Sequence, residues 1–523
     1  MELRLQRLAA LLAVCAAAVA LTACGGGGGG GGGALPLAAT PQRPAEPAAE
    51  DDGIVASASV AGLCAAPRNG IDPDTGAAYP DRSGTTADEK RWVRGWIDET
   101  YLWFDEVPAT LASKDYATPI AWFNVLKTPQ LTASGRAKDR FHFTQDTAAY
   151  RALSQGGMDV SYGLELAFLS ASPPRDVRVA YIEPGSPAAQ AGIVRGTRVV
   201  EIDGVDVANG SDTTTLNAGL VHAREGETHS FKLRAPDGTE RSVALAAARV
   251  TRVPVQNVKT IATASGPVGY MQFNDHLATA EAALIAAMNQ LQAAGIVDLV
   301  IDMRYNGGGL LDVASELASM VSSSGATTGA VFERLVFNSK NPFRLAPAQA
   351  ALPFHVTSRG FSTPAGQPLP RLGLTRVTVL AGPDTCSASE SVINSLRGVG
   401  VAVSLIGGAT CGKPYGFLPQ DNCGTTYFAI QFQGVNNQGF GDYGDGFAPT
   451  CAVADDFDHA LGDPAEARLA AALTLRSTGA CPAPDSRKAD VARRKSEALG
   501  MPYLVRVPAR ESRLVVTLPS TQP

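Results

Sequence analysis

Two side chains of this 523-residue chain, Ser387 and Lys413, have the types and surroundings needed for nucleophilic catalysis. A serine hydroxyl is a weak nucleophile until a base takes its proton, and a lysine amine is a base only when burial keeps it neutral. Lys413 follows the apolar run 399–406 and a turn of small residues at 407–412, with few charges nearby. The pair is therefore a candidate nucleophile and general base for acyl transfer.

The segments around Ser387 predict the elements that must hold it. Residues 376–381 are β-branched and apolar and end at Gly-Pro, which predicts a buried strand, and residues 387–396 predict a helix. A serine at this corner lies at the positive end of the helix dipole, where backbone N–H groups stabilise an anionic intermediate. The N–H of Ala388 is the natural first oxyanion donor.

A purely structural role for the same residues stays open at this point. Ser387 and Glu390 also fit a helix capping box, in which the serine caps the helix and the glutamate reaches back to it. A lone Gly-Lys pair is commonly a surface turn.

A second glycine-rich corner favours the catalytic reading. Residues 298–304 predict a strand, and Gly307–Gly309 lead into a predicted helix at 310–320. Glycines at such a corner allow positive φ angles and close backbone approach, which suits a second oxyanion donor. A plain tight turn between strand and helix is the alternative.

The order of four motifs resembles the C-terminal processing peptidases, also called tail-specific proteases, over about residues 85–475. The motifs are Gly-Tyr-Met-Gln-Phe at 269–273, Asp-Met-Arg-Tyr-Asn-Gly-Gly-Gly at 302–309, Ser-Ala-Ser-Glu at 387–390 and Thr-Cys-Gly-Lys at 410–413. The resemblance implies that Ser387 is the nucleophile, Lys413 the general base, and the amides of Ala388 and Gly308 the oxyanion hole. Ser389 is the rival nucleophile within the same motif.

The lysine segment departs from the family pattern. Many family members carry a glutamine four residues after the lysine that orients its amine, whereas this chain has Phe417 there. The serine-to-lysine spacing is also one residue longer than usual. Gln420 is a candidate substitute for the missing glutamine.

Residues 156–247 resemble a PDZ domain. They alternate short strands and glycine turns around one Ala-rich helix. The loop Tyr162, Gly163 and Leu164 would offer backbone N–H groups to the C-terminal carboxylate of a peptide that adds as a strand. Thr197 stands where many bacterial PDZ domains have aspartate. A β-rich structural domain without a ligand is the alternative.

The amino terminus predicts a lipid anchor. Arg4 and Arg7 precede an apolar segment that ends in Leu-Thr-Ala-Cys, so residues 1–23 resemble a bacterial lipoprotein signal peptide cleaved before a diacylated Cys24. A transmembrane helix is the alternative. Residues 24–80 are expected to be a Gly/Ala/Pro-rich tether. The predicted location is the cell envelope, at the outer membrane facing the periplasm if the organism is Gram-negative.

The cysteines and the net charge limit the remaining possibilities. The formal net charge is −6, and no basic patch suggests nucleic acid. An oxidising envelope allows disulfides among the six cysteines after Cys24, with Cys423–Cys451 preferred. Cys386 and Cys411 flank the Ser/Lys segments, so a bridge between them would staple the site. The cysteine and histidine spacings fit no metal site, and no cofactor is expected.

The expected fold class is α/β and multidomain. A small N-terminal helical domain (81–155) precedes the PDZ-like domain (156–247), an α/β peptidase core of βα units (248–480) and a tail of unassigned role (481–523). The expected function is an envelope serine endopeptidase that binds protein C-termini. A non-catalytic peptide- or ligand-binding lipoprotein on the same scaffold is the alternative, as is a PDZ scaffold with a structural peptidase domain. The oligomeric state is left open.

Overall fold

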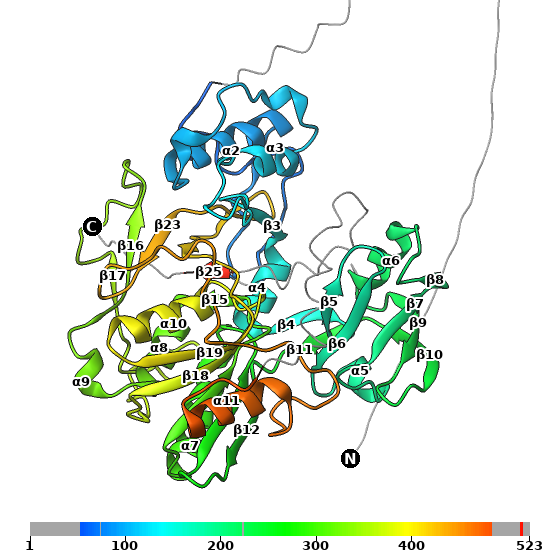
Figure 1. Cartoon of the computed structure of the whole chain (residues 1–523). Coiled ribbons are helices and arrows are strands. Elements are labelled where there is room, and N and C mark those ends of the chain that lie inside the picture. The colour runs from blue at the N-terminus through cyan, green and yellow to red at the C-terminus, as the bar shows by residue number, and fades with distance from the viewer. Residues whose placement is uncertain (1–52, 74, 222–223, 484–512, 516–523) are drawn as a thin grey trace, which may run out of the picture. The chain divides into compact units, whose positions relative to one another are not determined.

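The structure is a computed structural model that describes residues 53–73, 75–221, 224–483 and 513–515 (Figure 1). The predicted signal segment, Cys24 and the glycine run after it lie outside these residues. Within the described ranges, the helices are all too short or too polar to cross a bilayer.

A mainly parallel six-stranded sheet forms the centre of the predicted peptidase core (248–480). Its order is β12-β13-β14-β18-β19-β24, and only β12 runs antiparallel to its neighbour. The strands are β12 (Val255–Ile261), β13 (Val268–Phe273), β14 (Asp298–Asp302), β18 (Arg376–Ala381), β19 (Ala402–Gly407) and β24 (Cys451–Ala452). Every residue of β13 and β14 is buried, as expected for parallel strands covered on both faces. The loops after β14, β18 and β19 therefore leave from one common edge of the sheet.

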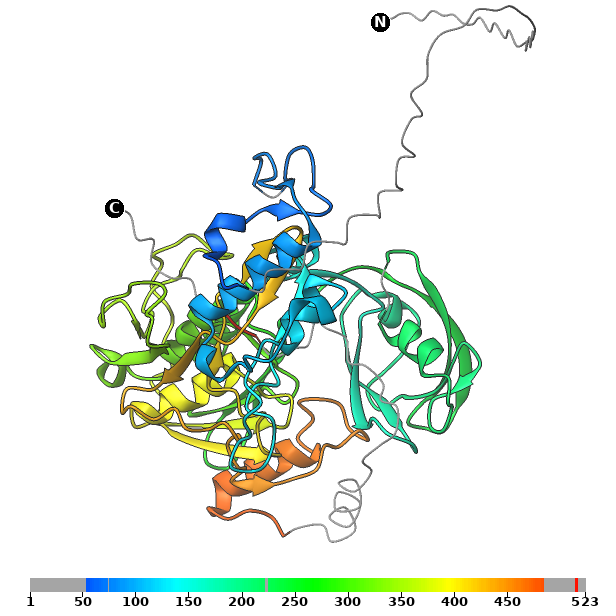
Figure 2. The same cartoon turned by 90° about the horizontal axis from the view of Figure 1, so that it is seen from above.

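Helices cover both faces of this sheet. Helices α7 (Ala280–Ala293), α8 (Leu311–Val321) and α10 (Ala388–Gly398) share one hydrophobic core with alternate residues of the strands. On the other face α11 (Ala467–Thr478) packs against the remaining strand residues and lies beside β18 and β19 in both views (Figures 1 and 2). This two-sided packing confirms the predicted α/β core and fixes the sheet edge from which the site loops leave.

The predicted PDZ domain at residues 156–247, called the PDZ module below, has its own sheet and its own hydrophobic core. The sheet order is β10-β9-β7-β6-β5, with β8 paired to β7, so that β5 lies at the edge. The elements are β5 (Leu164–Ser170), β6 (Asp176–Ile182), α5 (Pro187–Gln190), β7 (Arg198–Ile202), β8 (Val205–Asp206), α6 (Thr213–Leu220), β9 (Thr228–Arg234) and β10 (Glu240–Ala246). A two-stranded ribbon of β4 (Met158–Ser161) and β11 (Ala248–Thr251) joins the module to the rest of the chain.

The N-terminal part packs on a hairpin of the peptidase core through an aromatic cluster. Its elements are α1 (Ser57–Val60), β1 (Leu63–Cys64), β2 (Arg82–Ser83), α2 (Thr86–Thr100), the 3-10 turns η1 (Phe104–Glu106) and η2 (Ser113–Asp115), α3 (Pro119–Val125), β3 (Phe143–Asp146) and α4 (Thr147–Gly156). Strand β3 pairs with β22 (Thr425–Phe428), which pairs with β21 (Gln420–Asn422). Trp92, Trp96 and Tyr101 are buried in this cluster.

The tether predicted at residues 24–80 ends earlier than expected. Ser57 is already part of the fold, because it donates hydrogen bonds from its backbone and hydroxyl to Glu99 at 2.8 and 2.6 Å. Cys64 is also joined to Cys423 by a disulfide. The composition of residues 24–80 could not predict these contacts, because the partners lie far away in the sequence.

The remaining strands form two smaller sheets. One has the order β17-β16-β23-β20 and consists of β17 (Ala351–Pro353), β16 (Val331–Phe337), β23 (Phe432–Val435) and β20 (Tyr415–Gly416); the short helix α9 (Ser324–Thr327) precedes β16. In the other, β15 (Gly308–Leu310) pairs in parallel with β25 (Arg513–Val515) from the end of the chain. The glycine corner is therefore an edge that already holds an added strand.

Three disulfides join the six cysteines of the described residues. The bonds are Cys64–Cys423, Cys386–Cys411 and Cys451–Cys481. The predicted Cys423–Cys451 pair is wrong, because Cys423 lies in the turn between β21 and β22, whereas Cys451 begins β24 at the edge of the central sheet. The predicted proximity of Cys386 and Cys411 is confirmed, with Cα atoms 5.1 Å apart.

Candidate active site

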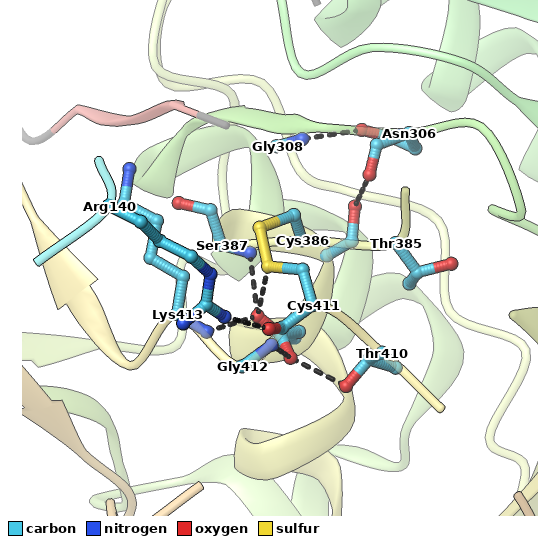
Figure 3. The surroundings of a disulfide bond; sticks show 12 residues. Arg140, Asn306, Gly308, Thr385, Cys386, Ser387, Thr410, Cys411, Gly412 and Lys413 are labelled. Carbon is cyan, nitrogen blue, oxygen red and sulfur yellow. Dashed lines mark hydrogen bonds between the residues drawn. A yellow bond between two sulfur atoms is a disulfide. The ribbon is translucent and has the colours of Figure 1, made fainter. Parts of the chain in front are cut away.

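The predicted site residues gather where three parallel strands end. The loop after β18 carries Ser387, the loop after β19 carries Lys413, and the loop after β14 carries Gly308. Open α/β sheets bind ligands at the carboxyl ends of their strands. Figure 3 shows these three residues around the Cys386–Cys411 disulfide.

Ser387 has the backbone of a strained corner residue. Its φ and ψ are 61° and −117°, and it directly precedes α10, whose first residue is the fully buried Ala388. A non-glycine residue at positive φ costs about 1–3 kcal/mol and persists only where its surroundings enforce it. Among the described residues nothing hydrogen-bonds to the Ser387 hydroxyl, so this hydroxyl does not cap the helix.

The second serine of the motif is occupied. Ser389 donates its hydroxyl hydrogen bond to the carbonyl of Asn306 at 3.1 Å, across from the glycine corner. It therefore links two loops, whereas the Ser387 hydroxyl is unengaged. This difference supports Ser387 over Ser389 as the nucleophile.

Glu390 is the centre of the site, which the sequence suggested only as a capping residue. Its buried carboxylate accepts hydrogen bonds from the N–H groups of Ser387 (3.0 Å), Gly412 (2.8 Å) and Lys413 (2.8 Å), and from the Thr410 hydroxyl (2.5 Å). The return half of the predicted capping box is thus present. Burial raises the pKa of the Glu390 carboxyl, while the four hydrogen bonds oppose that rise. One side chain therefore holds the serine loop against the lysine loop.

Lys413 is fully buried against aromatic rings. Its Nζ lies 3.6 Å from the ring centroid of Phe417 and 5.3 Å from that of Phe141. Phe417 also packs edge-on against Phe143 and Phe428 in the aromatic cluster shared with the N-terminal part. Gln420, the candidate substitute for the missing glutamine, is exposed in β21. Phe417 thus confines the amine with a ring face where a glutamine would have offered a hydrogen bond.

The glycine corner is held by two buried residues that the sequence did not single out, Asn306 and His276. Gly308 has φ of 102° and donates its N–H to Asn306 Oδ1 at 3.0 Å. His276 Nδ1 lies 3.1 Å from the same oxygen, and burial lowers the pKa of His276 to about 3, so the ring is neutral and donates there. The Asn306 carbonyl accepts the Cys386 N–H at 3.1 Å, which joins this corner to the serine loop.

The site is closed, and the Ser387 hydroxyl in it is not engaged. Ser387 and Lys413 are both 0% exposed, and the Ser387 hydroxyl makes no hydrogen bond to Lys413. The Gly308 N–H, predicted as an oxyanion donor, is occupied by Asn306. The structure brings the predicted residues into one cluster but leaves the hydroxyl–amine contact unmade.

The one group of potential metal ligands found among the described residues coincides with this site. It consists of Cys386, Glu390 and Cys411, whose ligand atoms lie within 4.8 Å of one another. Two of these donors are joined as a disulfide, which offers no thiolate to a metal.

The predicted peptide-binding loop lies at the start of the PDZ edge strand. Tyr162 is buried, Gly163 has φ of 73°, and Leu164 begins β5. The carbonyls of Tyr162 and Gly163 accept the N–H groups of Ala188 and Glu183. These bonds fix the loop at the end of the open edge of the sheet, where an added strand would end.

Three segments of the chain match known protein families. Residues 88–143 match the peptidase S41 N-terminal domain, residues 178–234 the PDZ domain, and residues 267–421 peptidase family S41. The last range contains both Ser387 and Lys413. The fold and the site thus define an α/β chain of the peptidase class with a PDZ module. Its core, residues 267–421, is similar to peptidase family S41, and the resemblance to C-terminal processing peptidases is confirmed.

Curated relatives carry corresponding names. The chain is 30% identical over 269 residues to a carboxyl-terminal-processing protease of Picosynechococcus sp., which covers 50% of this chain and 57% of the relative. It is 31% identical over 197 residues to the chloroplastic C-terminal processing peptidase of Tetradesmus obliquus, covering 36% and 42%. The chain thus spans about half the length of these relatives.

A solved structure shares the fold. The crystal structure of an S41 protease from Bacteroides fragilis aligns with a TM-score of 0.57 and 22% identity, over 77% of this chain and 98% of that one.

Proposed function

We propose that this protein is a serine endopeptidase in which Ser387 is the nucleophile and Lys413 the general base. The observation that carries the proposal is the Ser387 corner. A strained serine with an unengaged hydroxyl stands before α10, and Glu390 binds its backbone to that of Lys413. A helix cap needs neither the positive φ nor the tie to a buried lysine.

Chemistry on this scaffold requires a small rearrangement. The neutral Lys413 amine accepts the hydroxyl proton as the Ser387 oxygen attacks the scissile carbonyl, and it then delivers the proton to the leaving amine. The N–H of Ala388, in the first turn of α10, faces the developing oxyanion. Gly308 supplies the second donor once its N–H leaves Asn306. Water then hydrolyses the acyl-enzyme.

The PDZ module supports a preference for protein C-termini. Strand β5 lies at the open edge of its sheet, and the loop before it is fixed by backbone hydrogen bonds. A peptide that pairs with β5 would present its terminal carboxylate to the N–H groups of the 162–164 loop. The substrate class proposed is therefore unstructured C-terminal segments of proteins.

The decisive test is covalent labelling of the purified protein with a fluorophosphonate, followed by peptide mapping. We expect the label on Ser387, and loss of peptide hydrolysis in Ser387→Ala and Lys413→Ala with unchanged thermal unfolding. Ser389→Ala is the matched control and should keep measurable labelling. Hydrolysis at the wild-type rate by Ser387→Ala protein would refute the assignment.

A non-catalytic binding role is the second candidate, and one observation favours it. The Ser387 hydroxyl makes no hydrogen bond to Lys413, and Asn306 accepts the Gly308 N–H. A non-catalytic binding role predicts that no fluorophosphonate adduct forms and that the protein still binds peptides. Loss of that affinity on deletion of residues 156–247 would then identify the PDZ module as the functional part.

The proposed setting is the bacterial envelope, with a diacyl anchor on Cys24. The Leu-Thr-Ala-Cys sequence supports this proposal, and three disulfides in the described residues agree with an oxidising compartment. Metabolic labelling with a fatty acid should mark the wild-type protein and not Cys24→Ala. Equal labelling of both proteins would refute the anchor.

A further inference from the structure

The Cys386–Cys411 disulfide lies between the two residues proposed for catalysis. Cys386 directly precedes Ser387, and Cys411 lies two residues before Lys413. The parallel ladder of β18 and β19 ends at Ala381 and Gly407, so both loops have left the sheet before they reach these cysteines. Beyond the ladder, the Cys411 N–H donates to the Thr385 carbonyl at 3.0 Å. The disulfide is the covalent link next to that bond.

We propose that this disulfide is a positioning element of the catalytic site, so that a dithiol reductant lowers turnover without unfolding the protein. The proposal rests on the function proposed above. The disulfide fixes the approach of the chain to Ser387, whose positive φ needs support from both sides. On the far side Glu390 provides that support by accepting the Ser387 and Lys413 N–H groups. The disulfide and Glu390 thus connect the serine loop to the lysine loop at two different points.

Contacts around Cys411 extend the effect of the bond. Its Sγ lies 3.3 Å from Glu390 Oε2, the oxygen that accepts the backbone N–H groups of Ser387 and Lys413. Its carbonyl accepts a hydrogen bond from the guanidinium group of Arg140 (Figure 3). It also accepts one from the guanidinium group of Arg136 at 3.4 Å. A shift of Cys411 would therefore disturb the Glu390 carboxylate and the two guanidinium groups. Because Glu390 accepts the Lys413 N–H, the position of Lys413 would change as well.

The bond is chemically accessible from one side. Cys411 is only partly buried, whereas Cys386 is buried. A thiolate of the dithiol attacks the Cys411 sulfur, the S–S bond breaks, and its electron pair leaves on Cys386, which takes up a proton. The second thiol of the reductant then displaces Cys411, giving two cysteine thiols and one oxidised dithiol. The Cys411 thiol so formed becomes a donor to Glu390.

The test compares three pairs of cysteines. Cys386→Ala/Cys411→Ala is the test variant, and Cys64→Ala/Cys423→Ala and Cys451→Ala/Cys481→Ala are the matched controls. For the test variant we expect a 10- to 100-fold lower kcat on an unstructured peptide (of the order seen for ~1 Å misplacement of reacting groups), little change in KM, and a displaced pH profile of kcat. Thermal unfolding checks that each variant is folded.

Dithiothreitol supplies the second arm. It should lower the kcat of wild-type protein to the level of the test variant, reoxidation should restore it, and the test variant should not respond. Wild-type kcat and pH profile in the test variant, or an equal response of the test variant to dithiothreitol, would overturn the positioning role while leaving the peptidase assignment intact. Failure of the oxidised wild-type protein to react with fluorophosphonate would instead overturn the proposed function, and the role of the disulfide with it.

Discussion

Replacing Glu390 with glutamine is the sharpest single perturbation that the site offers. One carboxylate oxygen accepts the Ser387 and Lys413 N–H groups, and the other accepts the Gly412 N–H and the Thr410 hydroxyl. A glutamine side chain has one acceptor oxygen and one NH2 group, so either orientation directs donors at two of these four groups. If the NH2 group points toward Ser387 and Lys413, the backbone N–H groups of both residues lose their acceptor.

The number of donors left without an acceptor sets the expected loss of stability. Each buried donor left without a partner costs about 1–3 kcal/mol, so two cost about 2–6 kcal/mol. Removing a carboxylate whose pKa burial has raised offsets part of that loss, so we expect a fall of about 2–4 kcal/mol in the free energy of unfolding. Because the serine and lysine loops lose their common acceptor, the rate of acylation should fall by about 100-fold.

Urea unfolding and stopped-time fluorophosphonate labelling measure the two effects. Glu333→Gln is the matched control, because Glu333 is equally buried in β16 but its carboxylate accepts none of the loop N–H groups. Unchanged stability and acylation in Glu390→Gln, or an equal acylation defect in Glu333→Gln, would refute the reasoning.

Three further predictions concern pH, the lysine environment and the tail. Burial raises the pKa of Glu333 to about 7, so its stabilising contribution is complete below its unfolded pKa of about 4.5 and is lost as pH rises through 7; urea unfolding should show this decline in wild-type protein and not in Glu333→Gln. Phe417→Leu removes a ring face that favours a cation, worth about 1–2 kcal/mol when buried, so the rise of kcat/KM with pH should move about one unit lower; an unmoved profile would contradict it. Truncation after residue 483 removes β25 from β15, and faster peptide hydrolysis is expected; a slower rate would show that β25 supports the site.

The local elements of the peptidase core were predictable because their patterns are strong. The β-branched run at 376–381 is β18 with the same limits, and the predicted helix at 387–396 is α10, which begins one residue later. The shift has a reason, because Ser387 adopts positive φ instead of helical angles. The capping motif correctly predicted the return of Glu390 to the Ser387 N–H.

The contacts that assemble the site could not be predicted from local patterns. The Asn306 carbonyl reaches Cys386 and Ser389 from more than 75 residues away, and His276 reaches Asn306 from another loop. The one sequence signal for these contacts was an asparagine, Asn306, directly before the glycines at 307–309. The disulfide partners were equally beyond spacing arguments, because Cys64 and Cys423 are far apart in sequence and meet only through the packing of β1 near the β21–β22 turn.

The Cys64–Cys423 bond has a consequence for self-cleavage by the proposed peptidase. It closes a loop of 359 residues that includes both exposed connections of the PDZ module and the serine segment. A single cut in any surface loop within this span leaves two pieces that are still covalently joined. Nicked molecules would run as one band without a reductant and as two bands with it, and the fragments would have no opportunity to diffuse apart. The bond would therefore keep the fragments of a self-cleaved chain together.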